Sequence, residues 1–151
     1  MAKDKISLIK KTTTEFLEKL LIAAEIKVEE ADGAVQVNIE TADPGILIGR
    51  HGRNLEAIQI LLGQMIYQTL GEWTRIVVSV GDYRERRAKQ LQELALNVAQ
   101  KVTETKEPMV ISDLTPAERR IIHLILQDHE SVKSESEGEG KLRKLVIKPR
   151  V

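Results

Sequence analysis

The chain has 151 residues, of which 23 are Lys or Arg and 23 are Asp or Glu, so its formal net charge is zero. Hydrophobic residues make up 42% and charged residues 30%, a composition typical of a globular protein with one large or two small cores. The absence of cysteine excludes disulfides, Cys-ligated zinc, iron–sulfur clusters and thiol catalysis. No apolar run approaches the ~20 residues of a membrane span, and the first residues do not resemble a signal peptide, so we expect a cytoplasmic protein with no membrane insertion.

The zero total hides an uneven distribution of charge. Residues 1–44 carry 6 basic and 9 acidic side chains, a net charge of −3, whereas residues 45–101 carry 8 basic and 5 acidic ones, a net charge of +3. Residues 102–151 balance at 9 of each sign. The composition therefore argues against a histone-like polycation, but it leaves room for a local basic surface that faces an anionic partner.

The first half of the chain changes between helical and strand periodicity. Apolar residues at every third or fourth position predict a helix from about Thr12 to Glu25, with threonine hydroxyls as N-caps and residues 1–11 as an extension before it. Alternating apolar residues on both sides of Asp32-Gly33 predict a β-hairpin. Beyond it, the sequence predicts a short helix begun by Asp43 and Pro44, a glycine loop, a helix over residues 55–70 and a strand over residues 75–80.

The second half begins with a long helix predicted over residues 83–105, which Pro108 prevents from continuing. Thr115-Pro116-Ala117-Glu118 is a capping box with proline at the first helical position, so a helix is predicted from there to about Asp128. A second hairpin with a glycine turn is predicted from residues 132–137, 138–140 and 142–148. The predicted fold class is therefore α+β.

The glycine loop is the first candidate site. Gly49 and Gly52 enclose Arg50 and His51, and Arg53 follows, so a permissive backbone is surrounded by positive charge at the start of a helix. The loop lacks the Lys-Ser/Thr of a nucleoside-triphosphate-binding loop and the G-x-G-x-x-G spacing of a dinucleotide fold. On spacing alone, such a G-x-x-G is more often a turn than a binding site.

The surroundings of this loop resemble a KH domain. The Ile-Leu-Ile before the G-x-x-G, the amphipathic helix after it and the next strand look like the KH core, and the preceding helix and two strands give the type II order α-β-β-α-α-β. This resemblance covers residues 12–80. It implies that the loop holds the backbone of about four single-stranded nucleotides while the adjoining groove reads their bases. We expect the strand near Val35 to Ile39 to line that groove.

The second candidate site is a pair on the helix after the capping box. Arg119 and His123 are four residues apart, so they share one helix face and together suit a phosphate or a base edge. A structural alternative is that His123 is a half-buried, hydrogen-bonded core residue, because apolar residues surround it. Arg120 lies about 100° around the helix from Arg119 and is a weaker candidate.

An Arg-x-x-x-His helix behind a long helix, followed by a glycine turn and a basic strand, resembles the R-three-H domain. A KH domain followed directly by an R-three-H domain is similar to the bacterial Jag family of SpoIIIJ-associated proteins, also called KhpB or EloR. Residues 81–87 and 118–123 look like that family's own strings. The resemblance implies a KH domain over residues 12–81 and a small α+β R-three-H domain, with its long leading helix, over residues 82–151. It assigns nucleic-acid binding to Gly49, Arg50, His51, Gly52, Arg53, Arg119, Arg120 and His123.

Other charged and aromatic residues have two interpretations each. Arg84, Arg86 and Arg87 oppose the dipole at the start of the long helix, which either a phosphate or the neighbouring carboxylates would compensate. In the last hairpin, Arg143 faces away from Lys144 and Lys148, so at most one of the two sets faces a ligand. We expect Trp73 and Tyr83 to pack at the domain junction and not to stack on bases.

These observations predict a binder of single-stranded nucleic acid, with RNA as the expected ligand and single-stranded DNA as the other candidate. No enzyme is expected, because the three histidines lie apart and no nucleophile elbow, metal motif or paired acidic motif is present. No cofactor and no metal are expected. The competing hypothesis is a protein-interaction adaptor, for which the family resemblance implies a small KH-domain partner and links to the membrane insertase or to cell elongation.

Overall fold

The computed structural model describes residues 2–151, and it divides into two compact units. The first unit ends at Arg84, and the second extends from Glu85 to Val151. Each unit has a hydrophobic core made from its own helices and its own sheet. Among the described residues, no helix combines the length and the apolar composition that crossing a bilayer requires.

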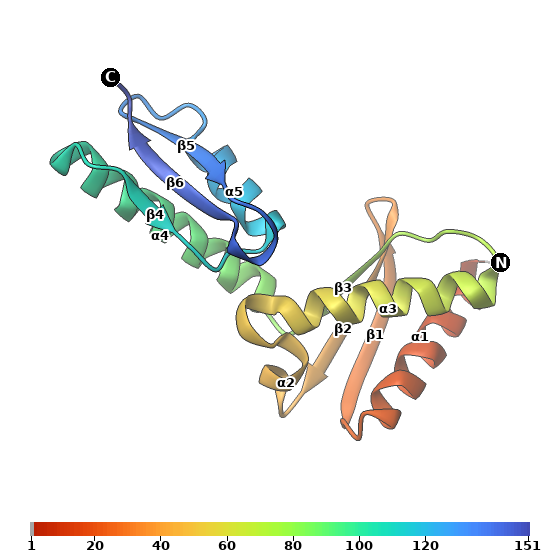
Figure 1. Ribbon diagram of the computed structural model, residues 1–151. Helices are drawn as coiled ribbons and strands as arrows, with labels where there is room; N and C mark the ends of the chain where they lie inside the picture. Colours follow the sequence, from red (N-terminus) through yellow and green to blue (C-terminus); the bar gives the residue numbers. More distant parts are fainter. Residues whose placement is uncertain (1) are drawn as a thin grey trace. The chain divides into compact units, whose positions relative to one another are not determined.

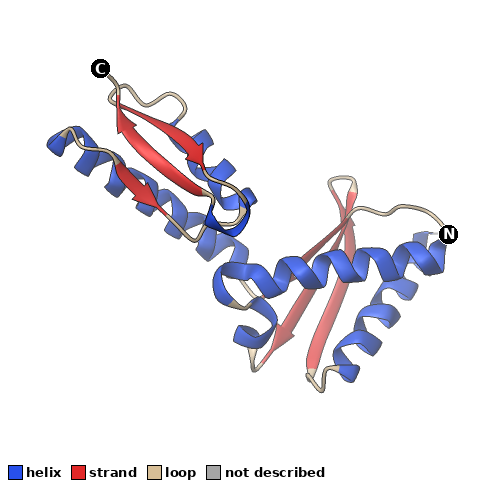
Figure 2. Ribbon diagram, viewed as in Figure 1, coloured by secondary structure: helices blue, strands red, loops and turns tan. Residues whose placement is uncertain are grey.

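The first unit is a three-stranded sheet with helices packed against it (Figures 1 and 2). β1 (Ala24–Ala31) pairs antiparallel with β2 (Ala34–Thr41), and β2 pairs parallel with β3 (Ile76–Val80), so β2 is the central strand. The helical elements are α1 (Ala2–Lys19), α2 (Pro44–Ile48), the 3-10 turn η1 (Arg50–Gly52) and α3 (Arg53–Leu70). The order α-β-β-α-α-β confirms the predicted type II KH order.

The helix predicted over residues 12–25 is wrong at both ends. α1 begins at Ala2, and Ile9 on its inner face is fully buried. The hydroxyls of Thr13 and Thr14 donate to the carbonyl oxygens four residues earlier, each at 2.8 Å, so they lie inside the helix and do not cap it. At the other end, Leu21 has a φ of 59°, which stops the helix. Residues 2–11 are helical because tertiary packing of Ile9 supports a polar sequence.

The hairpin predicted at Asp32-Gly33 is confirmed. Both residues have positive φ, 54° and 73°, as a two-residue type I′ turn requires. The short helix α2 begins at Pro44 as predicted, but the side chain of Asp43 makes no capping hydrogen bond. Instead, the backbone N–H of Asp43 donates to the hydroxyl of Thr41 at 3.3 Å.

β3 forms an edge of the sheet, and two side chains cover this edge at Val78. Gln59 of α3 accepts a hydrogen bond from the Val78 N–H at 3.0 Å, and Arg84 donates to the Val78 carbonyl oxygen at 2.8 Å. Arg84 also donates to the side chain of Gln59 at 2.8 Å, so both side chains are bonded to each other as well as to the backbone of Val78. The free backbone groups of Val78 are therefore not available for pairing with another strand.

The second unit is a three-stranded antiparallel sheet that packs against two helices (Figure 1). Its strand order is β4-β6-β5, formed by β4 (Met109–Ile111), β5 (Val132–Glu137) and β6 (Lys144–Pro149). The remaining elements are α4 (Tyr83–Thr105), α5 (Pro116–Leu126) and the 3-10 turn η2 (Gly140–Leu142). The predicted long helix, capped helix and hairpin are confirmed, whereas β4 was not predicted.

α5 begins at the predicted capping box. The Thr115 hydroxyl accepts from the Glu118 N–H, and the Glu118 carboxylate accepts from the Thr115 N–H, both at 3.2 Å. The same carboxylate forms an ion pair with Arg87 of α4 at 2.7 Å. Because both side chains are largely buried, this ion pair fixes the start of α5 against α4.

Candidate nucleic-acid interface

The G-x-x-G loop is a single tight turn between α2 and α3. Gly49 has a φ of 68°, Gly52 a φ of 78°, and His51 between them has a φ of 55° although it is not a glycine. The Gly49 N–H closes α2 by donating to the Gly45 carbonyl oxygen at 2.9 Å. Three left-handed residues in four reverse the chain so sharply that α3 begins at once.

Both glycines are also required by close packing. A Cβ atom at Gly49 would lie 2.5 Å from Cγ of Asn54, whose side-chain N–H donates to the Ile46 carbonyl oxygen at 3.0 Å. At Gly52, a Cβ atom would lie 2.9 Å from the ring of Tyr83. The side chains of Asn54 and Tyr83 therefore hold the loop in place, which the sequence alone did not indicate.

The charged side chains of the loop surround the start of α3. Arg50 and Arg53 are exposed, and His51 is half-buried. Gly52 occupies the N-cap position, so no side chain caps the first turn of α3. The amide groups of this turn and the positive charge beside them suit an anion. The structure thus brings all five predicted loop residues, Gly49 to Arg53, to one end of α3.

The strand predicted to line the base-binding groove, β2, is not the strand that lies beside the hollow. The apolar side chains of β2 at Val35, Val37 and Ile39 are buried in the core, so they offer no surface to a base. The hollow beside α3 lies instead against the edge strand β3, with a volume of about 320 Å³. It is lined by Gln59, Ile60, Gly63, Gln64, Trp73, Thr74, Arg75, Ile76 and Val77. β2 is central and covered by helices, which explains the difference.

The predicted Arg119/His123 face is present on α5. Arg119 is half-buried, and its guanidinium donates to the Leu114 carbonyl oxygen at 2.8 Å. His123 is exposed, and its Nδ1 lies 2.6 Å from Oγ of the buried Ser134 on β5. The hydrogen bond expected of a core histidine is present, but the residue is exposed and not half-buried.

A second hollow of about 350 Å³ lies in front of this face. Its lining combines Arg119, Arg120 and His123 of α5 with Arg143, which lies between η2 and β6. The remaining lining residues are Pro116, Ser134, Glu135 and Ser136. Arg120, the weaker candidate in the sequence, therefore shares one hollow with Arg119, and three guanidinium groups surround the same space.

Known protein families match both units. A family described as "KhpA/KhpB, KH domain" matches residues 7–79, and the R-three-H domain family matches residues 89–149. The chain therefore contains a KH domain of the KhpA/KhpB type followed by an R-three-H domain. Its first unit is thus the KH domain, its second unit is the R-three-H domain, and its fold is α+β as predicted.

Proteins named "RNA-binding protein KhpB" are similar to most of this chain. The protein from Clostridium symbiosum is 37% identical over 139 residues, which are 88% of this chain and 63% of that protein. The protein from Lactiplantibacillus plantarum is 31% identical over 131 residues, 87% of this chain and 41% of that protein. The Bacillus subtilis protein is 30% identical over 126 residues, 82% of this chain and 61% of that protein. The chain thus spans between 41% and 63% of the length of these three relatives.

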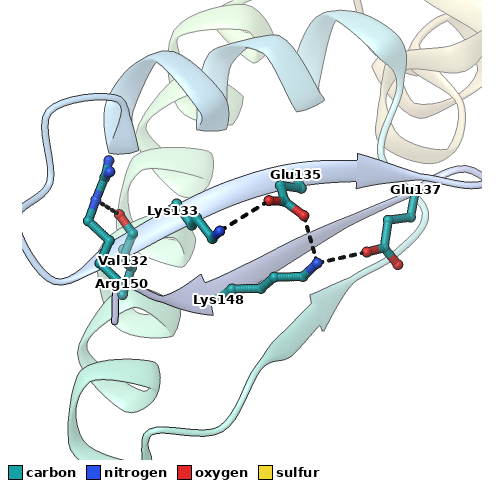
Figure 3. Close-up of polar contacts among 6 residues, drawn as sticks. All are labelled: Val132, Lys133, Glu135, Glu137, Lys148 and Arg150. Atoms are coloured by element: carbon teal, nitrogen blue, oxygen red, sulfur yellow. Dashed lines mark hydrogen bonds and ion pairs between the residues drawn. The ribbon is translucent and has the colours of Figure 1, made fainter.

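Lys148 of the R-three-H domain is not among the residues that line the hollow, and it is paired with two acids of β5. Lys148 Nζ lies 2.6 Å from Glu135 and 3.1 Å from Glu137, and Lys133 lies 3.4 Å from Glu135 (Figure 3). The hydrogen bond from Lys148, with the charges of both lysines, lowers the pKa of Glu135. The hydrogen bonds that Lys148 donates to Glu135 and Glu137 raise the pKa of Lys148. Of the basic residues on the two faces of the last hairpin, Arg143 therefore lines the hollow and Lys148 does not.

The arginines at the start of α4 have partners within their own units. Arg84 covers the β3 edge, where burial lowers the pKa of its guanidinium. Arg87 pairs with Glu118 in the R-three-H domain. Arg150 at the end of the chain donates to the carbonyl oxygens of Gln127, His129 and Val132, the last of these drawn in Figure 3. These three basic residues therefore have structural partners.

The two aromatic residues expected to pack behave differently. Tyr83 packs against Gly52 in the KH domain. Trp73 is 72% exposed, and its ring lies 6.4 Å from the ring of Tyr67, centroid to centroid. The expectation that Trp73 is a packing residue is therefore wrong.

Among residues 2–151, no three His, Cys, Asp or Glu side chains are grouped as metal ligands.

Proposed function

We propose that this chain binds single-stranded RNA without catalysing a reaction, through the KH loop and the Arg119/His123 face. The observation that carries the proposal is the hollow of the R-three-H domain, where Arg119, Arg120 and Arg143 gather beside the exposed His123. Similarity to proteins named RNA-binding KhpB supports RNA as the ligand. A cytoplasmic location accompanies this function.

In the KH domain, the proposed contact is with the sugar–phosphate backbone. Gly49 and Gly52 allow the sharp turn of the loop, so that a phosphate can approach the amide groups at the start of α3. Arg50 and Arg53 add charge from exposed positions on either side of the turn. Bases extending from this backbone would reach the hollow between α3 and β3.

In the R-three-H domain, the proposed contact is with a further phosphate or base edge. Arg119 keeps several N–H groups free of its bond to Leu114, and a guanidinium binds phosphate oxygens in bidentate fashion. The start of α5 is closed by its capping box, so its amide groups are occupied and the side chains carry the recognition. Two weak modules on one chain gain affinity through effective concentration.

The test is fluorescence anisotropy of labelled single-stranded RNA and DNA pools. Arg50→Asp/His51→Asp removes the loop charge, Arg119→Ala/His123→Ala removes the helix face, and Lys10→Asp/Lys11→Asp reverses two exposed charges on α1 as a control. We expect the first two variants to weaken binding and the control to bind like the wild type. Circular dichroism verifies folding, and a folded wild type that binds neither pool at physiological salt contradicts the proposal.

A second candidate function, a protein adaptor, is favoured by one observation. Ile60, Leu61 and Tyr67 are exposed on neighbouring turns of α3, and the exposed Trp73 lies beside them. Apolar side chains in such a stripe mark a surface that another protein covers. Under this alternative the partner is a small KH-domain protein. Light scattering with and without RNase distinguishes the two functions, because a protein partner stays bound after the RNA is degraded.

A further inference from the structure

The imidazole of His123 is held from one side only. Its Nδ1 lies 2.6 Å from Oγ of Ser134, and the ring is otherwise at the protein surface. Among residues 2–151, Nε2 has no hydrogen-bond partner, and it lies at the hollow that Arg119, Arg120 and Arg143 also line. One nitrogen is thus fixed by the protein, and the other is available to a ligand.

Ser134 is well placed to control this ring. It comes from the start of β5, its side chain points to the helix side of the sheet, and it is only 8% exposed. Its neighbours in register are apolar, since Ser134 is opposite Ile147 on β6 and two residues from the buried Val132. A hydroxyl in such a place needs a hydrogen-bond partner, because leaving it unpaired is costly.

The direction of this hydrogen bond follows from the partners available. Within the described part of the chain, the hydroxyl of Ser134 has one hydrogen-bond partner, which is Nδ1 of His123. A neutral imidazole has one nitrogen that accepts and one that donates. If the hydroxyl donates to Nδ1, its proton is satisfied and the ring carries its own proton on Nε2. If the hydroxyl accepted instead, its buried proton would have no acceptor.

We propose that Ser134 is a positioning residue that keeps Nε2 of His123 protonated and directed into the hollow as a hydrogen-bond donor. This inference rests on the proposed function, because it assigns the donor to an oxygen of the bound RNA. A protonated imidazolium would donate from Nδ1 to the same hydroxyl, so Nε2 remains a donor in either state. A carboxylate in place of Ser134 would reverse the neutral tautomer.

The tautomer is measured directly by two-bond proton–nitrogen correlation NMR on the full-length, nitrogen-15-labelled chain without RNA. The pH is raised until the ring signals no longer change, and the spectrum of the neutral rings is recorded there. His129 is an internal reference, because its Nδ1 accepts the backbone N–H of Ser131 at 3.1 Å, which fixes its proton on Nε2. A His123→Gln variant identifies the His123 signals by their loss.

We expect His123 to show the same pattern as His129 in the wild type. In Ser134→Ala the ring loses its donor, and the pattern should move toward a mixture of the two tautomers. Ser134→Thr retains a hydroxyl and should restore the wild-type pattern. Ser112→Ala is the control, since Ser112 lies in the same domain, is exposed, lines neither hollow and is not bonded to His123.

RNA affinity is measured on the same four proteins by anisotropy. Loss of one positioning hydrogen bond should weaken binding roughly two- to tenfold in Ser134→Ala, with recovery in Ser134→Thr and no change in Ser112→Ala. Melting temperatures show whether any variant has lost its fold. A wild-type His123 with its proton on Nδ1, or a Ser134→Ala variant with an unchanged ring pattern and affinity, overturns the assignment.

The two readouts separate this inference from the function on which it rests. If the wild type shows the Nε2 tautomer and Ser134→Ala loses it, but no RNA binds, then the proposed function fails while the control of His123 by Ser134 stands. If RNA binds and depends on His123 while Ser134→Ala changes neither readout, the function stands and the positioning role of Ser134 is overturned.

Discussion

Gly52 lies against the ring of Tyr83, so closely that a Cβ atom at Gly52 would be 2.9 Å from Cε1 and 3.1 Å from the hydroxyl oxygen. Gly52 also has a φ of 78°, a conformation that L-amino acids with side chains rarely adopt. The second glycine of the G-x-x-G is therefore required by the fold of the KH domain, before any ligand is considered.

Gly52→Ala should destabilise the KH domain. The strained φ and the contact with Tyr83 together should lower the free energy of unfolding by about 1–3 kcal/mol. Gly45→Ala is the matched control, since a Cβ atom there meets nothing within 4 Å and φ is ordinary, so we expect a change within about 0.5 kcal/mol. Urea unfolding of both variants tests the difference, and equal midpoints would contradict it.

Glu118→Ala should destabilise the R-three-H domain. The substitution removes the capping interaction with Thr115 and the largely buried ion pair with Arg87, which should cost about 3–5 kcal/mol. In contrast, the double variant Arg87→Met/Glu118→Leu replaces the ion pair by apolar contact and should lose less than the single variant. Thermal unfolding of the variants gives the comparison. A double variant less stable than Glu118→Ala would contradict it.

The sequence was most informative where local chemistry decides the structure. α4 has the predicted bounds, because its apolar stripe is regular and Pro108 follows its end. The capping box at Thr115 and the turn at Asp32-Gly33 are equally local, and both are found. Each of these features depends on residues close together in the chain, and so periodicity and turn preferences suffice to find it.

The sequence was least informative where distant residues decide the structure. The first ten residues of α1 look polar, and the burial of Ile9 under the KH core supports them. β4 has only three residues, too few for a periodic signal, and it exists because it pairs with β6. For the same reason, the hollow of the R-three-H domain could be predicted only in part. Arg143 and Ser134 join Arg119 and His123 through the register of the last hairpin.

The ladder of ion pairs formed by Lys133, Glu135 and Lys148 should stabilise the chain at neutral pH, and this stabilisation should be lost in acid. The pKa of Glu135 is lowered in the folded state, so its contribution is present above the unfolded value of about 4.3 and disappears as pH falls through the folded value. Lys148→Met should therefore destabilise the chain at pH about 7 and have no such effect well below pH about 4. Denaturant unfolding at both pH values provides the measurement.

At alkaline pH, it is Lys148 that loses its contribution to stability. Its pKa is raised in the folded state, so its contribution is present at neutral pH and disappears as pH rises through the folded value, above about 10.4. Because the ladder lies on an exposed face, added salt should reduce both effects. A Lys148→Met effect of the same size at acid and neutral pH would show that lost packing is responsible.

Trp73 is the single tryptophan of the chain, and it lies beside the α3 stripe and also lines the hollow between α3 and β3. Because it is 72% exposed, its emission should be that of a solvated indole, and quenching by acrylamide should be efficient. A protein partner on Ile60 and Leu61 should shift the emission to shorter wavelength and protect it from the quencher. RNA held only at the hollow of the R-three-H domain should leave the emission unchanged, whereas bases in the hollow that Trp73 lines should change it. RNase digestion would reverse a change caused by bases and leave one caused by a protein partner.

Arg143→Gln should weaken RNA binding more than Lys148→Gln, although both substitutions remove one positive charge from the same hairpin. Arg143 lines the hollow beside Arg119, where its bond to the Gly138 carbonyl oxygen at 3.2 Å fixes its direction. Lys148 does not line the hollow and is paired with Glu135 and Glu137. A phosphate contact releases counterions, so its loss lowers the slope of log affinity against log salt by roughly one unit for a single phosphate.

The measurement is a set of RNA titrations at four or more salt concentrations for the wild type and both variants. The Arg143→Gln line should be weaker at low salt and flatter, and should converge with the wild-type line as salt rises. The Lys148→Gln line should run parallel and close to the wild type. If both variants lose affinity and slope equally, RNA responds to the summed charge of the domain, and the hollow has no special part in binding.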